Sequence, residues 1–544
     1  MPPLPEDRLD SWKEIAAYLK RGVRTVRRWE REEGLPVHRL LHRKLGSVFA
    51  YKSDIDAWRR SRAPAAAVAV PHRGSDPGQT KSIAVLPFTN LSTDPENAYF
   101  SDGLTDEVTA LLSKTRALRV ISRTSSMTFK GTSKGVRTIA GELGVRYVLE
   151  GSVRRAGRRL RITAQLIDAS MDDHVRADTY DGTIDDVFAI QERLARVIVN
   201  ALELQLTADE QRRLVERPID NLRAFQCYLR ARQEEWRGRK DAIDHAIHLL
   251  RNGLEIIGDN AELYAALGLA FLQYREAGID FGEPPLLEAE TCVRKVFDLE
   301  QASASGLRLR GWIHYARGRV QEAVRDLKAA LDLDTNSADT LLLLSNCYLI
   351  SGRVSIARPL IARLLGVDPL TPVSRCMPAW ADVLDGRLAD TIDPYRQMVE
   401  MDPANPMAKL FYLWVLVVNR RAHATGAVLE TFTREVRDTV PARIAFFLAH
   451  ALAGNRREAQ AVLTPEIEAV AAGSDVFPRF LAQGFALAGI PERAMYWLEV
   501  AVDRGFINHP FLVQHDPLIA SLRKLPRFTQ LMKTVRIRWE RFEA

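Results

Sequence analysis

The stretch Val23-Arg-Thr-Val-Arg-Arg-Trp-Glu-Arg31 organises the N-terminal part of this 544-residue chain. At helical spacing, the apolar side chains Val23 and Val26 fall on one side. Four arginines line another side of the same helix: Arg24, Arg27, Arg28 and Arg31. One side can pack against a core while the other presents a row of guanidinium groups, a pattern typical of a helix that lies in a DNA groove.

A further helix precedes this basic helix. Ile15, Ala16 and Leu19 recur at helical spacing, and Lys20-Arg-Gly22 then interrupts the pattern. Glycine tolerates positive φ, so Gly22 allows a tight turn at this point. The sequence therefore predicts a helix, a tight turn and a second helix.

A basic hairpin and a short helix are expected after the basic helix. Residues 37–51 carry several His, Arg and Lys side chains before an alternating stretch, which predicts two strands joined as a wing. Ser53-Asp54 then predicts the N-cap of a closing helix over residues 55–60. We expect Trp58 to seal a core that would be too small without such an aromatic side chain.

Ile15-Ala-Ala-Tyr-Leu19, the run from Val23 to Pro36 and Ser53-Asp-Ile-Asp-Ala-Trp58 together resemble the winged helix-turn-helix of the MerR and excisionase families. In those families the second helix enters the major groove and the wing touches the phosphate backbone or the minor groove. The resemblance implies DNA contacts from the helix by Arg24, Thr25, Arg27 and Arg28, with Arg31 on the same row, and from the wing by Arg39, Arg43 and Lys44. MerR regulators continue into a long dimerisation helix, whereas a linker follows here, so the resemblance implies neither dimerisation nor an effector.

The charge distribution favours the same interpretation. Residues 1–62 hold 15 Lys and Arg against 9 Asp and Glu, so this short part of the chain carries +6 of the overall +7. Because charge, motif and wing coincide, we expect the module to bind duplex DNA. Two alternatives stay open. In the first, the basic residues only form a solvent-exposed face of the domain. In the second, the N-terminal domain contacts protein, and the chain is an interaction scaffold that does not bind DNA.

Length and composition predict several domains. We expect a winged helix-turn-helix domain at residues 1–62, a flexible linker rich in Ala, Pro and Gly at 63–82, an α/β domain at 83–206 and an all-α repeat solenoid with a C-terminal cap at 207–544. The N-terminus lacks the pattern of a signal peptide, and the longest apolar run, Leu410–Val418, is too short to cross a bilayer, so we expect a cytoplasmic protein. The four cysteines are scattered, which predicts free thiols, no metal site and no cofactor.

From Ile83 the pattern alternates between strand and helix. Strands are expected at 83–88, 118–122, 147–154, 159–168 and 174–180, and helices at 101–114, 136–143 and 184–204. Ser101 and Asp102 are the expected caps of the first helix, and Gly144 the expected end of the second. The sum is a small α/β layer with helices packed on strands.

Ser82-Ile-Ala-Val-Leu-Pro-Phe88, Tyr99-Phe-Ser-Asp-Gly-Leu-Thr105 and Leu143-Gly-Val-Arg-Tyr-Val-Leu-Glu-Gly-Ser-Val-Arg-Arg155 resemble the TolB-like N-terminal domain. The resemblance implies an adaptor, of the kind found in bacteria between DNA-binding, cyclase or kinase modules and helical repeats. The β-propeller that follows in periplasmic TolB is absent from this sequence, so a role in the cell envelope is not implied.

Three features of the middle domain bear on possible chemistry. Asp102, Asp106 and Glu107 are neighbouring carboxylates, but at a predicted helix N-terminus they more often serve as caps. Residues 130–135 lack the spacing of a phosphate-binding loop, and Arg123-Thr-Ser125 reads as a surface turn in preference to a pocket wall. Because no catalytic motif is present either, we expect no catalytic residues and no enzymatic activity.

From about Leu222 a 34-residue period replaces the strand signals. It is carried by Gly318, Gly352 and Gly386 and by Asp334, Asp368 and Asp402. With Trp312 and Tyr315 before the glycine, Ala323 after it and Asp-Pro at the unit ends, the period resembles tetratricopeptide (TPR) repeats. Glycine would make the turn within each helix pair, and Asp-Pro would start the next unit.

Stacked helix pairs form a curved surface, and we expect a protein or peptide partner on its concave side. The alternative is that the solenoid only holds the protein together or dimerises it. The whole sequence is thus interpreted as a DNA-binding transcriptional regulator with an adaptor domain and a repeat domain. A homodimer on a two-fold DNA site is left open.

Overall fold

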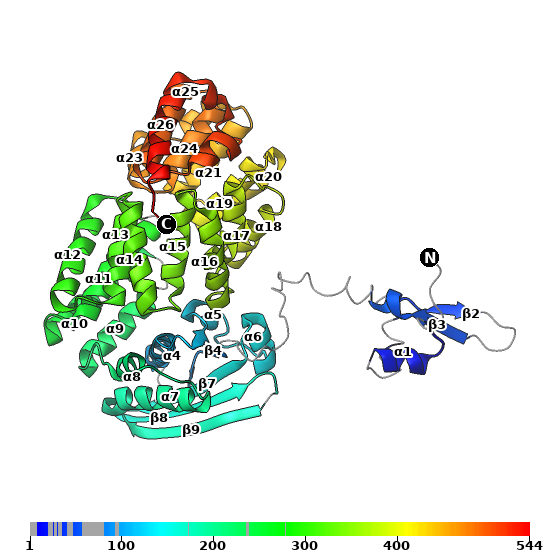
Figure 1. Cartoon of the computed structure of the whole chain (residues 1–544), viewed down its shortest axis with the longest axis vertical. Coiled ribbons are helices and arrows are strands. Elements are labelled where there is room, and N and C mark those ends of the chain that lie inside the picture. Colours follow the sequence, from blue (N-terminus) through cyan, green and yellow to red (C-terminus); the bar gives the residue numbers. More distant parts are fainter. Residues whose placement is uncertain are drawn as a thin grey trace. The chain divides into compact units, whose positions relative to one another are not determined.

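The computed structural model describes residues 8–19, 26, 30, 35–40, 47–56, 81–92, 97–171, 173–235, 239–277 and 279–543. The chain forms two compact units, Met1–Gln79 and Thr80–Ala544, each of which is described by itself (Figure 1).

The N-terminal unit contains a three-stranded antiparallel sheet and a short helix. The strands are β1 (Arg8–Leu9), β2 (His38–Leu40) and β3 (Ser47–Tyr51), in the order β1-β3-β2. The predicted hairpin is confirmed by the pairing of β2 with β3, whereas β1 was not predicted because two residues are too short to show a pattern. Helix α1 (Trp12–Tyr18) begins at Ser11, whose hydroxyl accepts the Glu14 N–H.

The small core of this unit contains Ile15 and Ala16 of α1 together with Val26 and Ile55. Val26 is fully buried, as expected for the apolar side of the basic helix. The last helix was predicted over residues 55–60 with a cap at Ser53-Asp54, but the chain is already helical over residues 52–56, so that start is wrong. Trp58 and the basic stretches 20–25, 27–29 and 41–46 lie outside the described residues, so the winged helix-turn-helix as a whole stays a prediction.

A mixed sheet forms the middle of the chain. Its strands are β4 (Lys81–Val85), β5 (Thr89–Asn90), β6 (Leu118–Val120), β7 (Tyr147–Ala156), β8 (Arg159–Asp168) and β9 (Asp173–Thr183). The order is β6-β4-β7-β8-β9, with β5 paired to β7; β4 runs parallel to β6 and β7, and β7, β8 and β9 are antiparallel. The predicted α/β layer with its long hairpin is therefore observed.

Helices cover both faces of β4, because its buried side chains alternate between two cores. Ile83 and Val85 belong to the core formed with α4 (Ala98–Ser113) and α7 (Val187–Ala201). Ala84 and Leu86 belong to the core formed with α6 (Val136–Leu143) and with Ile121 and Phe129, which flank α5 (Arg123–Met127). The predicted end of α6 is confirmed, since Gly144 adopts a φ of 64°. A 3-10 turn at Ile184–Asp186 precedes α7.

The start of α4 differs from the prediction. The helix begins at Ala98 after Asn97, so Ser101 and Asp102 are not caps but buried residues within it. Tyr99 and Phe100 are buried in the core, and their packing requires the additional first turn. The burial of Tyr99 and Phe100 therefore decides where α4 begins, and the capping preference of Ser101 and Asp102 does not.

The rest of the chain is helical. The helices are α8 (Ala208–Val215), α9 (Leu222–Glu235), α10 (Lys240–Ile257), α11 (Ala261–Glu276), α12 (Glu283–Leu299), α13 (Ala304–Ala316), α14 (Val320–Leu333), α15 (Ala338–Ile350), α16 (Val354–Val367), α17 (Pro372–Leu384), α18 (Ile392–Met401), α19 (Pro406–Val418), α20 (Ala422–Glu430), α21 (Val440–Leu452), α22 (Arg456–Ala461), α23 (Pro465–Gly473), α24 (Phe477–Leu487), α25 (Pro491–Asp503) and α26 (Pro526–Glu540). A π turn at Phe511–His515 and a 3-10 turn at Ala520–Lys524 lie between the last two helices. Successive helices pack in pairs along most of this part (Figure 1).

The periodic glycines occupy the predicted turns. Gly318, Gly352 and Gly386 adopt φ values of 72°, 70° and 76° between the two helices of a pair. Arg420, one period after Gly386, adopts a φ of 56° although it has a Cβ atom. The role given to Asp-Pro was wrong, because Asp368 and Asp402 cap the C-termini of α16 and α18 and do not start the next unit.

One hydrophobic core joins the sheet to the first repeat helices. It contains Leu104 and Val108 of α4 together with Phe225 and Leu229 of α9. A Cβ atom at Gly103 would lie 2.6 Å from a methyl carbon of Leu229, so α4 and α9 approach closely only because Gly103 has no side chain. The boundary suggested at residues 206/207 therefore falls between helices that share a core.

Candidate functional site

Most of the predicted DNA-contacting residues lie outside the described part of the chain. These are Arg24, Thr25, Arg27, Arg28, Arg31, Arg43 and Lys44. Arg39 is placed by its backbone in β2, opposite Val48 of β3, and its side chain is not described. The structure thus positions both strands of the wing, β2 and β3, but it does not describe the basic side chains.

The same hairpin carries an aromatic and cationic cluster that the sequence analysis missed. The rings of His38 and Phe49 are stacked with centroids 5.0 Å apart, and Tyr51 meets Phe49 edge to face at 5.6 Å. The Arg8 guanidinium lies 4.2 Å from the Phe49 centroid. The alternation in residues 47–51 placed Phe49 and Tyr51 on one face, but nothing local could place Arg8 against them.

The three neighbouring carboxylates of α4 have separate environments, and none of them is a cap. Lys130 Nζ lies 2.7 Å from both carboxylate oxygens of the buried Asp102. Asp106 pairs with Arg123, and burial raises the pKa of Asp106 to about 6 although that guanidinium opposes the shift. Glu107 faces a cavity.

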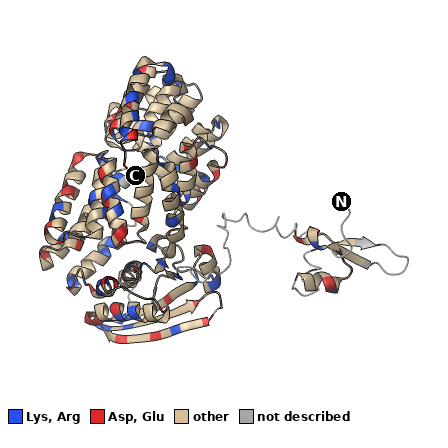
Figure 2. Cartoon of the chain, in the orientation of Figure 1, with Lys and Arg blue, Asp and Glu red and all other residues tan. Residues whose placement is uncertain are grey.

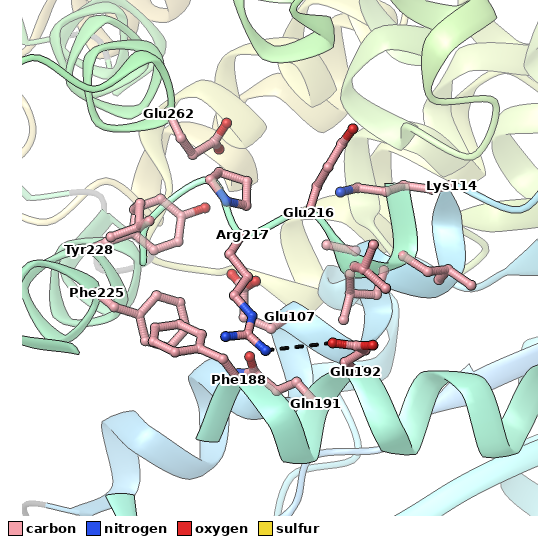
Figure 3. Close-up of a pocket in the computed structure, with 16 residues that line it drawn as sticks. Glu107, Lys114, Phe188, Gln191, Glu192, Glu216, Arg217, Phe225, Tyr228 and Glu262 are labelled. Atoms are coloured by element: carbon pink, nitrogen blue, oxygen red, sulfur yellow. Dashed lines mark ion pairs between the residues drawn. The ribbon is translucent and has the colours of Figure 1, made fainter. Parts of the chain in front are cut away.

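This cavity lies between the sheet layer and the first repeat helices. Its volume is about 150 Å³, and its walls come from α4, α7, the segment between α8 and α9, α9 and α11 (Figure 3). Burial, reinforced by the Glu262 and Asp106 carboxylates, raises the pKa of Glu107 to about 7. A carboxyl that titrates near neutral pH in a cavity is a candidate for ligand binding.

The junction of the sheet with the repeats contains a second cluster. The buried Asp368 carboxylate accepts hydrogen bonds from Ser122, from Ser125 at 2.7 Å and from Ser374 at 2.6 Å. Thr371 donates a fourth at 2.7 Å. The prediction of a surface turn at Arg123-Thr-Ser125 is therefore wrong: this segment starts α5, and Ser125 is fully buried against a repeat. The 34-residue period identified Asp368, but two of its partners, Ser122 and Ser125, lie more than 240 residues away in the sequence.

The first helices of the repeats present a regular inner row, which is covered by the chain itself. Asn346, Trp380 and Trp414 are spaced by one period. The Arg479 guanidinium of α24 lies 4.3 Å from the Trp380 centroid and 5.0 Å from that of Trp414. Trp414 also donates to Gln483 of α24 at 2.8 Å. Residues of α24 therefore already cover Trp380 and Trp414.

Arg479 itself offers a test of this packing. Burial lowers its pKa to about 10, and one of its terminal nitrogens has no hydrogen-bond partner. Methionine fills most of the volume of the arginine side chain, whereas truncation to alanine leaves a cavity. We expect Arg479→Met to lower the melting temperature of the full chain less than Arg479→Ala does, because methionine keeps most of the packing. A large loss with Arg479→Met would show that the charge is required.

Two negative findings apply to the described residues only. Within them, no group of three or more His, Cys, Asp or Glu side chains could hold a metal ion. None of their helices is both long enough and apolar enough to cross a membrane. Lys and Arg are intermixed with Asp and Glu over the Thr80–Ala544 unit (Figure 2), and residues 63–544 carry only +1 of the net charge of +7.

Comparisons with known proteins match two parts of the chain. The family model of the HilA/YgeH-like transcriptional regulator, second domain, matches residues 79–196, and a tetratricopeptide-repeat model matches residues 314–373. The middle of the chain is thus similar to a domain of transcriptional regulators, and TPR repeats follow it. Neither match includes residues 1–62, so the resemblance to MerR and excisionase stays a prediction, as does the TolB-like resemblance.

A curated relative from Rhizobium meliloti (strain 1021), named putative adenylate cyclase 3, is 44% identical over 191 residues. The match covers 35% of this chain and 32% of the relative, so the chain spans about a third of that protein's length. A thermophilic TPR protein from Thermus thermophilus is similar with a TM-score of 0.29 and 17% identity, over 34% of this chain and 99% of that chain. A TPR protein from Parabacteroides merdae ATCC 43184 has a TM-score of 0.33 and 14% identity, over 47% and 98%.

Proposed function

We propose that this chain is a DNA-binding transcriptional regulator whose N-terminal unit contacts duplex DNA. The observation that carries the proposal is the concentration of +6 of the net +7 charge in the 62 residues that contain the β2–β3 hairpin and the buried Val26. The similarity of residues 79–196 to a domain of transcriptional regulators supports it.

In the proposed mechanism the basic helix enters the major groove and the wing holds the phosphate backbone. The Thr80–Ala544 unit acts as a TolB-like adaptor joined to a TPR domain that receives a protein partner. Because the inner row at Trp380 and Trp414 is already packed, the partner would use another surface of the repeats. Association of two chains would present two heads to a two-fold DNA site.

Salt-dependent retention on duplex DNA tests the proposal. With about six phosphate contacts, the logarithm of the affinity should fall against the logarithm of the salt concentration with a slope near about −5. If the purified full-length chain does not bind duplex DNA even at low salt concentration, the proposal is contradicted. That result would favour the alternative of a scaffold whose head contacts protein.

We propose further that the chain has no catalytic activity, a point raised by the name of the curated relative. The chain matches about a third of that relative, whose named activity can reside in the remainder. Phosphoryl chemistry commonly uses metal ions held by carboxylates, and within the described ranges no group of acidic, His or Cys residues could hold one. Incubation of the purified chain with ATP and Mg²⁺ or Mn²⁺ should yield no cyclic AMP; sustained turnover would overturn this proposal.

A further inference from the structure

The cavity beside Glu107 contains more acidic than basic groups. Its lining includes four carboxylates, Glu107, Glu192, Glu216 and Glu262, and two cations, Lys114 and Arg217 (Figure 3). Apart from Gln191, its remaining walls are aromatic or apolar, among them Phe188, Phe225 and Tyr228. A concave site with apolar walls and a few converging polar groups is the usual form of a small-molecule site.

The two cations of the lining are already engaged. Arg217 pairs with Glu192 at 3.6 Å, the ion pair drawn in Figure 3, and lies 5.9 Å from the Phe188 centroid. Lys114 donates to the Arg213 carbonyl oxygen at 3.3 Å. Their charges therefore neutralise the Glu107 side of the cavity only in part.

The negative charge of Glu107 and Glu262 is compensated only in part, for Glu107 by Lys114 and Arg232. Ser305 donates a hydrogen bond to Glu262 at 3.0 Å, which leaves the negative charge of that carboxylate in place. No hydrogen bond or ion pair of the Glu107 carboxylate is found among the described residues. A carboxylate facing a partly apolar cavity is costly unless a positive charge meets it.

We propose that this cavity binds a small organic cation, a primary amine or amidine carried on a single ring or a short apolar chain. The cationic group would meet Glu107 and Glu262, and the apolar part would lie against Phe225 and the segment that precedes α9. This binding site is additional to the proposed DNA contact and does not depend on it.

The size and chemistry of the cavity argue for this class of ligand. A cavity of about 150 Å³ is the size that accommodates one benzene ring in a protein interior. Aromatic walls attract cations through their π faces in addition to the carboxylates. A bare divalent ion is a poorer fit, because among the described residues no group of carboxylates converges closely enough to hold a metal.

Binding should be coupled to pH. The charged groups facing Glu107 are Asp106 and Lys114 on α4, Glu262 on α11 and Arg232 on α9, and the pKa of Glu107 is about 7. Below pH 7 Glu107 is mostly protonated and must release its proton before it can pair with a cation, so affinity falls as pH falls. Between pH 8 and pH 6 the affinity should drop about tenfold, because the ionised fraction of a carboxyl with a pKa of about 7 falls from about 0.9 to about 0.1.

The test uses titration calorimetry of the full-length chain with benzylamine as the probe, and with 1,5-diaminopentane as a chain-like second probe. Benzyl alcohol is the neutral control of the same shape, benzoate the anionic one, and Mg²⁺ the metal control. We expect saturable binding of benzylamine, with benzyl alcohol at least about tenfold weaker, since hydrogen bonds to charged groups contribute roughly that factor or more. Equal binding of the alcohol, preference for benzoate or Mg²⁺, or no binding of either amine would overturn the proposal.

Glu107→Gln should weaken benzylamine binding about tenfold and remove the pH dependence, because the charge is lost while the shape is kept. Glu262→Gln is the second variant, to be used if the first does not fold, and should also weaken binding. The matched control is Glu255→Gln, which removes a charge from an exposed site on α10 and should leave affinity unchanged. Unchanged affinity in both cavity variants would assign the amine to another site.

Discussion

Replacing Arg24, Arg27 and Arg28 by alanine should reduce the affinity of the full-length chain for duplex DNA by about 100- to 1000-fold at about 0.1 M salt. Each phosphate contact contributes about −0.9 to the slope of log affinity against log salt, which at that concentration is close to a factor of eight per contact. Helical spacing predicts that the three arginines lie on a different side of the helix from Val26, which is buried, so the core should tolerate the change. Fluorescence anisotropy over a salt series measures both the affinity and the slope.

The control for this variant is Lys13→Ala, which removes a positive charge from the exposed side of α1. It should change affinity less than tenfold, since α1 is not the helix proposed to enter the groove. In the triple variant the slope should become shallower by about 2.7, three contacts at about 0.9 each. A triple variant with the wild-type slope and affinity would show that this helix does not contact DNA, even if other residues of the N-terminal unit do.

The parts of the fold that were predicted correctly are those that local sequence patterns determine. The β7–β8 hairpin follows from strict alternation around Ala156-Gly157, and the turn at Gly352 follows from a residue type that alone adopts positive φ without strain. The start of α4 was missed because Ser101 and Asp102 look like caps, whereas the burial of Tyr99 and Phe100 decides the boundary. Capping preferences amount to about 1 kcal/mol, less than the burial of two aromatic rings.

The candidate sites were harder to predict because their partners are distant in sequence. Glu107 was recognised as one of three close carboxylates, but its cavity depends on α9 and α11, more than 100 residues away. The packing of Arg479 on Trp380 and Trp414 was not predicted, because only the folded chain brings α24 against these two side chains. Periodicity identifies which side chains share a face and not what packs against them.

Asp368→Ala should destabilise the junction between the sheet and the repeats by about 3 kcal/mol or more. The carboxylate is 3% exposed and accepts hydrogen bonds from four hydroxyl groups, two of them on the sheet side of the junction. A hydrogen bond to a charged group contributes about 1.5–3 kcal/mol, and each buried hydroxyl left without an acceptor adds a further penalty. Asp368→Asn keeps one acceptor oxygen and should lose less.

Asp402 provides a matched control for Asp368. It occupies the same repeat position 34 residues later, but it is exposed and its carboxylate is held by Asn405 at 3.0 Å. Asp402→Ala should therefore cost no more than about 0.5 kcal/mol. Because a unit of this size need not unfold in one step, the comparison should use amide hydrogen exchange as well as the melting temperature.

The exchange experiment also separates a junction role from a role inside the repeat. If Asp368 fastens the repeats to the sheet, Asp368→Ala should accelerate exchange on both sides, in β6 and α5 as well as in α16 and α17. If it only orders its own loop through Thr371 and Ser374, faster exchange should be confined to the repeat side. The hydroxyl of Ser125 contacts the repeats by donating to this carboxylate and by accepting the Leu370 N–H at 3.0 Å. Ser125→Ala therefore completes a double-mutant cycle with Asp368→Ala. An interaction energy near zero between the two changes would rule out the junction role.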